Sequence, residues 1–186
     1  MYTTQSAEEK LLQDMITQYC RWASKSVYPE MKKLREVLTQ LTDQQKLHIL
    51  QQKYSLWTPL HRAAMSDHTE IINTLLTSLQ SSADRLKLLM VNDEDPPLHT
   101  AALHGHTESV KMILDCLTAD HQIRITSIQD YGGDTAIQIA DRRGRTDTAR
   151  VLREYQHRAD NLMRGYRILR AGQFNSFFQK CVYRVF

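Results

Sequence analysis

The sequence predicts an all-α helical repeat solenoid of about four helix pairs with a long C-terminal helical extension. Two observations carry this prediction. A seven-residue pattern occurs three times, at intervals of 38 residues from Leu60 to Leu98 and 39 residues from Leu98 to Ile137. Apolar residues also recur at helical spacing after each copy. Self-similarity at a period of about 20–50 residues is typical of stacked units that bury a continuous core only together.

The repeated pattern predicts the first helix of each unit. Its copies are residues 58–64 (TPLHRAA), 96–102 (PPLHTAA) and 135–141 (TAIQIAD). Pro59 and Pro97 fall in the first turn of the expected helix, where a missing N–H leaves no hydrogen bond unmade. The small alanines beside the leucine allow neighbouring helices to pack closely.

A second helix is expected after each copy. These helices open with residues 68–70, 106–108 and 145–147, and each of these triplets places a threonine before an acidic residue. Threonine is a good acceptor at a helix N-cap, and an acidic residue in the first turn favours the helix dipole. We therefore expect the threonines to cap the second helices.

At these residues the chain resembles the ankyrin-repeat family, whose pattern is a turn, Thr-Pro-Leu-His-x-Ala-Ala, a Gly-His step and a second helix. The resemblance covers roughly residues 50–156. The period exceeds the family's usual length of about 33 residues, so an extra turn or short helix is expected after each second helix. Only residues 130–134 keep the Asp-and-Gly turn that precedes the family motif, and the third copy has Ala136 and Gln138 for Pro and His.

The array is expected to extend upstream, because residues 38–49 match residues 114–125. A helix over about 29–41 is then the second helix of a degenerate first repeat, and a helix over about 7–24, opened by a Ser6-x-x-Glu9 capping box, is its partner. Three regions follow: a degenerate capping repeat (1–49), the ankyrin-like repeats (50–156) and a basic amphipathic C-terminal extension (157–186).

The last helix is expected to continue far beyond Thr146. Its apolar positions recur at intervals of three and four residues, and Gly165 weakens a helix without ending it. Two interpretations stay open: the extension folds back as a cap on the last repeat, or it is an exposed element for self-association, an acidic partner or an anionic membrane surface. The apolar seam consists of Leu152, Tyr155, Ala159, Leu162, Tyr166 and Leu169.

Charge is distributed unevenly along the chain. Residues 1–141 hold 13 Lys/Arg and 18 Asp/Glu, a net of −5, whereas residues 142–186 hold 11 and 3, a net of +8. The arginine-rich stretch raises nucleic-acid binding as an alternative. Asp147, Glu154 and Asp160 interleave these arginines, however, and the preceding repeats are acidic, so the sequence argues against that alternative.

Several other function classes are disfavoured. The three cysteines, Cys20, Cys116 and Cys181, have no metal-site or disulfide spacing, and no glycine loop could hold a phosphate. His99, His104 and His106 lie close together, but the resemblance gives His99 and His106 structural roles. We expect no enzyme activity, no cofactor, no metal and no membrane insertion. A reducing compartment, the cytosol or nucleus, fits these features.

The resemblance implies a non-catalytic adaptor, inhibitor or scaffold that binds another protein through a concave face. The turns and first helices form this face, and Trp57 is interpreted either as part of it or as a core residue under an irregular turn. The partner-binding residues carried over position by position are Tyr54, Ser55, Trp57, Met65 and Ser66 in the first clear repeat, Glu94, Asp95, Leu103 and His104 in the second, and Tyr131, Asp134, Arg142 and Arg143 in the third.

Overall fold

The computed structural model describes residues 28–53, 57–91 and 95–168. Within these ranges the protein is all-α, with ten helices and no strand beyond isolated bridge residues. The expected helix over residues 7–24 lies outside the described residues. The helices are α2 (Tyr28–Gln40), α3 (Asp43–Leu50), α4 (Pro59–Met65), α5 (Thr69–Thr77), α6 (Ser82–Leu89), α7 (Pro97–His104), α8 (Thr107–Asp115), α9 (Ala119–Thr126), α10 (Ala136–Arg142) and α11 (Thr146–Ile168).

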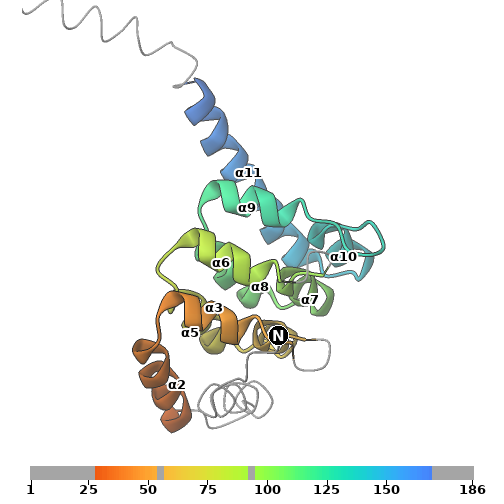
Figure 1. Cartoon of the computed structure of the whole chain (residues 1–186). Coiled ribbons are helices and arrows are strands. Elements are labelled where there is room, and N and C mark those ends of the chain that lie inside the picture. The colour runs from red at the N-terminus through yellow and green to blue at the C-terminus, as the bar shows by residue number, and fades with distance from the viewer. Residues whose placement is uncertain (1–27, 54–56, 92–94, 169–186) are drawn as a thin grey trace, which may run out of the picture.

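Helices at equivalent positions of successive repeats stack in three rows (Figure 1). The first helices α4, α7 and α10 form one row, and the second helices α5, α8 and α11 form another. The short helices α3, α6 and α9 form the third row. The extra element that the long period predicts is therefore confirmed as a short helix, α6 after α5 and α9 after α8.

The first helices begin with reciprocal capping. In α4 the Thr58 hydroxyl accepts from the His61 backbone N–H (3.4 Å), and His61 Nδ1 accepts from the Thr58 backbone N–H (3.3 Å). Thr135 and Gln138 make the same pair of bonds in α10. Pro96 caps α7 without such bonds, so Nδ1 of the buried His99 has no protein partner in the described chain.

The expected threonine caps of the second helices are wrong for α5 and α8. The cap residues are His68 and His106, neither of which makes a side-chain cap bond, and the threonines are the first helical residues. The preceding turn explains the shift, since its left-handed residue, Asp67 (φ 55°) or Gly105 (φ 81°), brings the histidine into the cap position. The Thr107 hydroxyl instead contacts Thr148 of the next repeat at 2.8 Å.

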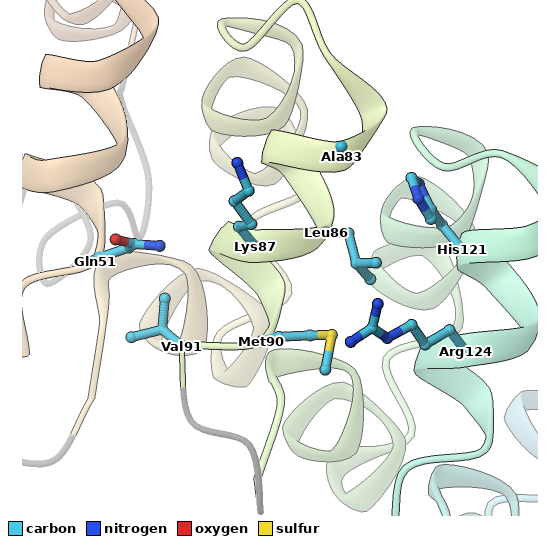
Figure 2. A pocket seen from close by; sticks show the side chains of 8 residues that line it. All are labelled: Gln51, Ala83, Leu86, Lys87, Met90, Val91, His121 and Arg124. Atoms are coloured by element: carbon cyan, nitrogen blue, oxygen red, sulfur yellow. The ribbon is translucent and has the colours of Figure 1, made fainter.

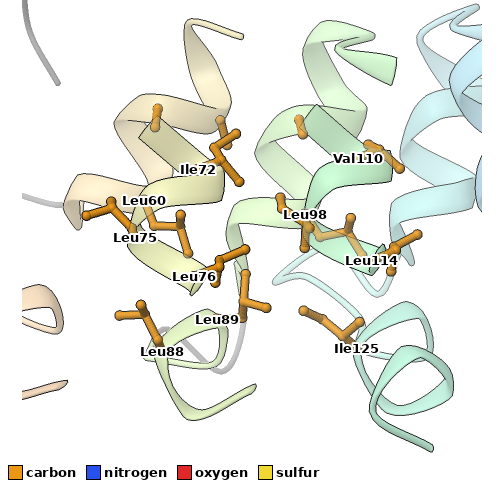
Figure 3. Close-up of a cluster of buried hydrophobic side chains, with 14 of the residues drawn as sticks. Leu60, Ile72, Leu75, Leu76, Leu88, Leu89, Leu98, Val110, Leu114 and Ile125 are labelled. Carbon is orange, nitrogen blue, oxygen red and sulfur yellow. The ribbon is translucent and has the colours of Figure 1, made fainter. Parts of the chain in front are cut away.

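The core runs unbroken through the stack (Figure 3). Leu60 and Leu98 of the first helices are 0–1% exposed, and the alanine pairs beside them are fully buried. The short third helices add their own apolar side chains, including Leu88, Leu89 and Ile125. Every row therefore contributes to one shared core, and removal of apolar surface from water between neighbours stabilises the array.

The fourth residue of each short helix carries a long hydrogen-bond donor, namely Lys46, Arg85 or Gln122. The donor satisfies carbonyl oxygens at the end of a second helix, where the last turn leaves carbonyls without intrahelical partners. Gln122 Nε2 donates to the carbonyl oxygen of Leu114 (2.8 Å), and Lys46 Nζ donates to that of Ser78 in the next repeat (2.8 Å).

Arg85 makes the largest set of these bonds. Its Nε donates to the carbonyl oxygens of Leu76 (3.1 Å) and Leu79 (2.9 Å). Its Nη1 donates to the carbonyl oxygen of Cys116 in the next repeat (3.0 Å). One guanidinium thus closes the end of α5 and joins it to the end of α8.

Helix α11 is the second helix of the last repeat and continues past the stack (Figure 1). Leu152, Tyr155 and Ala159 of its apolar seam are buried, and the Tyr155 hydroxyl donates to Asp115 Oδ1 of α8 at 2.6 Å. Leu162, further along the same seam, is 55% exposed. Helix α11 thus packs on α8, α9 and α10, and the fully buried positions of its seam end at Ala159.

We predict that Arg85→Met lowers the free energy of unfolding by about 1.5–3 kcal/mol, because it removes charged hydrogen bonds to several carbonyls. Urea denaturation followed by circular dichroism measures this loss. The matched control is Lys87→Met on the same helix, whose exposed pair with Asp84 is worth about 0–1 kcal/mol. Equal losses in the two variants would contradict a structural role for the Arg85 bonds.

Candidate functional site

A groove of about 340 Å³ crosses the side of the stack formed by the turns and the first helices. The turns before α4, α7 and α10 contribute to it, together with the facing residues of those helices. It therefore spans three successive repeats. Its lining residues are Trp57, Met65, Asp95, His99, Thr100, Leu103, His104, Asp130, Tyr131, Ile139, Arg142 and Arg143.

The turn before α10 holds Tyr131 at the rim of the groove. Asp130 Oδ1 accepts from the backbone N–H groups of Gly132 (2.8 Å) and Asp134 (2.9 Å). Gly133 takes the left-handed conformation (φ 81°) that the turn requires. The turn is thus fixed by its own sequence, and it leaves the Tyr131 side chain 78% exposed.

The opposite end of the groove is lined by Trp57 and Met65. The Trp57 ring is half-buried, with its centroid 5.5 Å from that of His61 and the planes inclined by 60°. Met65 is 37% exposed. The Trp57 ring thus packs on the repeat and also lines the groove.

The groove contains charges of both signs. Asp95 and Asp130 belong to the turns before α7 and α10, whereas Arg142 and Arg143 lie at the C-terminal end of α10 and its cap. Arg142 is paired with Asp134. Burial, and secondarily the negative charge of Asp130, raises the pKa of the Asp95 carboxyl above its ordinary value.

The histidines of the repeated pattern join one repeat to the next. His61 Nε2 bonds to the carbonyl oxygen of Asp95 (2.8 Å), and His99 Nε2 bonds to that of Ile128 (3.1 Å). Because Nδ1 of His61 accepts from Thr58, its Nε2 must carry the proton and donate. Burial is the main cause that lowers the pKa of both histidines. The His99 contact confirms the structural role expected for that residue, and His61 makes the equivalent contact one repeat earlier.

The groove gathers eight of the thirteen predicted partner-binding residues. Tyr54, Ser55 and Glu94 lie outside the described residues. Ser66 follows α4 at its C-cap, and Asp134 is the ion-pair partner of Arg142; neither lines the groove. The eight residues brought together are Trp57, Met65, Asp95, Leu103, His104, Tyr131, Arg142 and Arg143.

The sequence reasoning missed four lining residues: His99, Thr100, Asp130 and Ile139. Thr100 and Ile139 occupy the variable position of the repeated pattern, directly after His99 and Gln138. Variation at that position, set against the constant residues around it, was the available signal. Asp130 was assigned only to the turn, although its side chain also borders the groove.

A second cleft, of about 540 Å³, follows the row of short helices (Figure 2). Leu86, Met90 and Val91 give it an apolar lining, and Figure 2 shows the Arg124 guanidinium beside Met90. None of the thirteen predicted residues lines it. The two clefts therefore differ in position and in chemistry.

The described part of the chain has neither a metal-binding cluster nor a membrane-spanning helix. No group of three His, Cys, Asp or Glu side chains there is placed to hold a metal ion. No described helix combines the length and the apolar character that crossing a bilayer requires.

Comparisons with known proteins agree with the repeat architecture. A family model described as ankyrin repeats in three copies matches residues 79–164, and a model of a single ankyrin repeat matches residues 55–87. No curated protein sequence matches the chain. Among solved structures, the Yar1 chain in the crystal structure of the yeast ribosomal protein Rps3 in complex with its chaperone Yar1 is similar, with a TM-score of 0.53 and 19% identity. The match covers 79% of this chain and 91% of that chain, and it shows a shared fold.

The lowered pKa values of His61 and His99 predict a pH dependence of stability. The unfolded chain takes up protons first as the pH falls, so the free energy of unfolding should decrease below about pH 6.5. Replacing both histidines by glutamine, the residue at the equivalent position 138, should make this decrease shallower. Urea denaturation at about pH 7.5 and about pH 5.5 measures it for both proteins. An identical decrease in wild type and variant would contradict the assignment.

Proposed function

The chain belongs to the ankyrin-repeat family, and from that premise we propose that it is a non-catalytic protein-binding module, acting as an adaptor, inhibitor or scaffold. The partner is another protein, and the groove between the turns and the first helices is the docking surface. No cofactor takes part. We place this activity in the cytosol or nucleus, which fits the spacing of the cysteines.

One observation carries the choice of surface. In the described part of the chain, three large apolar side chains are exposed: Met65, Tyr131 and Leu162. Two of them, Met65 and Tyr131, line the same groove, where they join the half-buried Trp57 and Leu103. Apolar and aromatic side chains gathered in one depression are typical of protein interaction sites, and Trp and Tyr are enriched among the residues that dominate binding energy.

The packing of the groove also supports recognition. Its turns are joined to the neighbouring repeats by the His61 and His99 bonds, and its helices share the continuous core. A surface that is ordered before binding loses little conformational entropy when a partner docks. The similar chaperone Yar1, solved in complex with Rps3, gives a precedent for protein binding on this fold.

We predict that Tyr131→Ala and Trp57→Ala each weaken partner binding by at least about 1–2 kcal/mol, because both remove aromatic contact area from the groove. The partner is first captured from nuclease-treated lysate on the full chain, and its affinity is then measured by calorimetry. Leu162→Ala is the matched control, since it removes another exposed apolar side chain away from the groove. Unchanged affinity in both groove variants would move the site elsewhere.

The second candidate is self-assembly through the C-terminal helix. Leu162 favours it, because this seam residue is exposed on the part of α11 that runs past the stack (Figure 1). An exposed apolar position on an amphipathic helix can pair with the same helix of another copy.

This candidate predicts a concentration-dependent dimer that Leu162→Glu abolishes, because the substitution places a charge on the apolar seam. Size-exclusion chromatography with light scattering measures the mass of the full chain at several concentrations. Tyr131→Ala is the control, and it should leave the dimer intact. A monomer at every concentration would rule the candidate out.

A further inference from the structure

One carboxylate in the groove has no partner among the described residues. The Asp95 side chain is half-buried, and it makes no hydrogen bond or ion pair with any described residue. Nearby carboxylates differ, because Asp134 pairs with Arg142 and Asp141 pairs with Arg153. Asp95 therefore presents a carboxyl group without a described counter-charge in a depression that limits its contact with water.

A second acceptor in the same groove also lacks a partner. Thr100 is 3% exposed and lines the groove, and its hydroxyl oxygen has no hydrogen-bond partner among the described residues. Buried polar atoms in folded proteins are nearly always satisfied, so an unsatisfied one beside a groove points to a group that arrives from outside. Thr100 lines the same groove as Asp95, so a ligand in that groove would lie beside its side chain.

The electrostatics of the groove indicate the charge of this group. Burial and the neighbouring Asp130 both raise the pKa of Asp95, so its surroundings disfavour the carboxylate. A cation placed beside Asp95 would stabilise its carboxylate form and so lower its pKa again. Arg142 does not supply it, because its guanidinium is paired with Asp134. Arg143 is exposed, so solvent screens its repulsion of an incoming cation.

We propose that the groove binds a basic side chain, preferably arginine, of an extended partner segment, with Asp95 and the Thr100 hydroxyl as its hydrogen-bond acceptors. This inference rests on the proposed function and names the chemistry of the partner. A guanidinium has five N–H donors and a flat face, so it can satisfy both acceptors and stack on an aromatic ring. Trp57 and Tyr131, which line the same groove, supply such rings. Lysine offers a compact charge without the flat face.

The test uses a phage library of random dodecapeptides selected on the full chain. Enriched peptides are synthesised with a fluorophore, and their affinities are measured by anisotropy for wild type, Asp95→Asn, Tyr131→Ala and the control Asp120→Asn. Asp120 is an exposed acidic residue on α9, outside the groove. Each peptide is also made with its arginine replaced by citrulline, which keeps the shape and removes the charge.

We expect the enriched peptides to share one basic residue. Citrulline at that position should weaken binding to wild type by at least about tenfold, and Asp95→Asn should cause a similar loss. The two changes together should cost little more than either alone, which identifies a direct pairing. Asp120→Asn should stay within about twofold of wild type.

The outcomes separate this inference from the proposed function. Peptides that lose affinity with Tyr131→Ala but lack a basic residue, or do not respond to Asp95→Asn, would overturn the inference and leave the groove as the docking surface. Peptides that bind equally to Tyr131→Ala, or a selection that enriches none, would count against the groove itself and the inference with it.

Discussion

Each repeat leaves backbone carbonyl oxygens that a side chain of a neighbouring repeat must satisfy, and the rest of the structure depends on this constraint. On one side of the stack His61 and His99 reach the carbonyls of Asp95 and Ile128. On the other side Arg85 reaches Cys116. A buried carbonyl without a partner costs about 1–3 kcal/mol. The bond from His61 also fixes the backbone of Asp95. A contact that joins two repeats therefore also positions the Asp95 carboxyl group, the proposed acceptor in the groove.

Much of the fold could be predicted from the sequence, because stacking imposes the same requirements on every unit. The leucine and alanine positions of the first two copies are buried, and the excess length of the repeat forms the short helices α6 and α9. The caps of α5 and α8 could not be predicted from composition alone. They depend on the backbone of the preceding turn, where Asp67 adopts a conformation usually left to glycine.

The candidate site was only partly accessible to sequence reasoning. Eight of the thirteen positions carried over from the family line one groove, because the repeat geometry fixes which side of each first helix faces outward. Thr100 and Asp130 were missed because their roles depend on the surroundings of their side chains in the folded protein. The Thr100 hydroxyl lacks a hydrogen-bond partner, and Asp130 lies near Asp95. The influence of Asp130 on Asp95 emerges only when the second and third repeats are stacked, and the unsatisfied hydroxyl is visible only in the folded structure. A single repeat contains neither relationship.

The distance between stacked helices sets the spacing between equivalent positions along the groove. Packed helices lie about 8–10 Å apart, and an extended chain advances about 3.3 Å per residue. Thr100 and Ile139, which occupy the same position in adjacent repeats, would therefore face every third residue of an extended ligand lying across them. Inserting one residue into such a ligand would shift its side chains out of phase with the repeats. Spacing, as well as composition, would then distinguish one ligand from another.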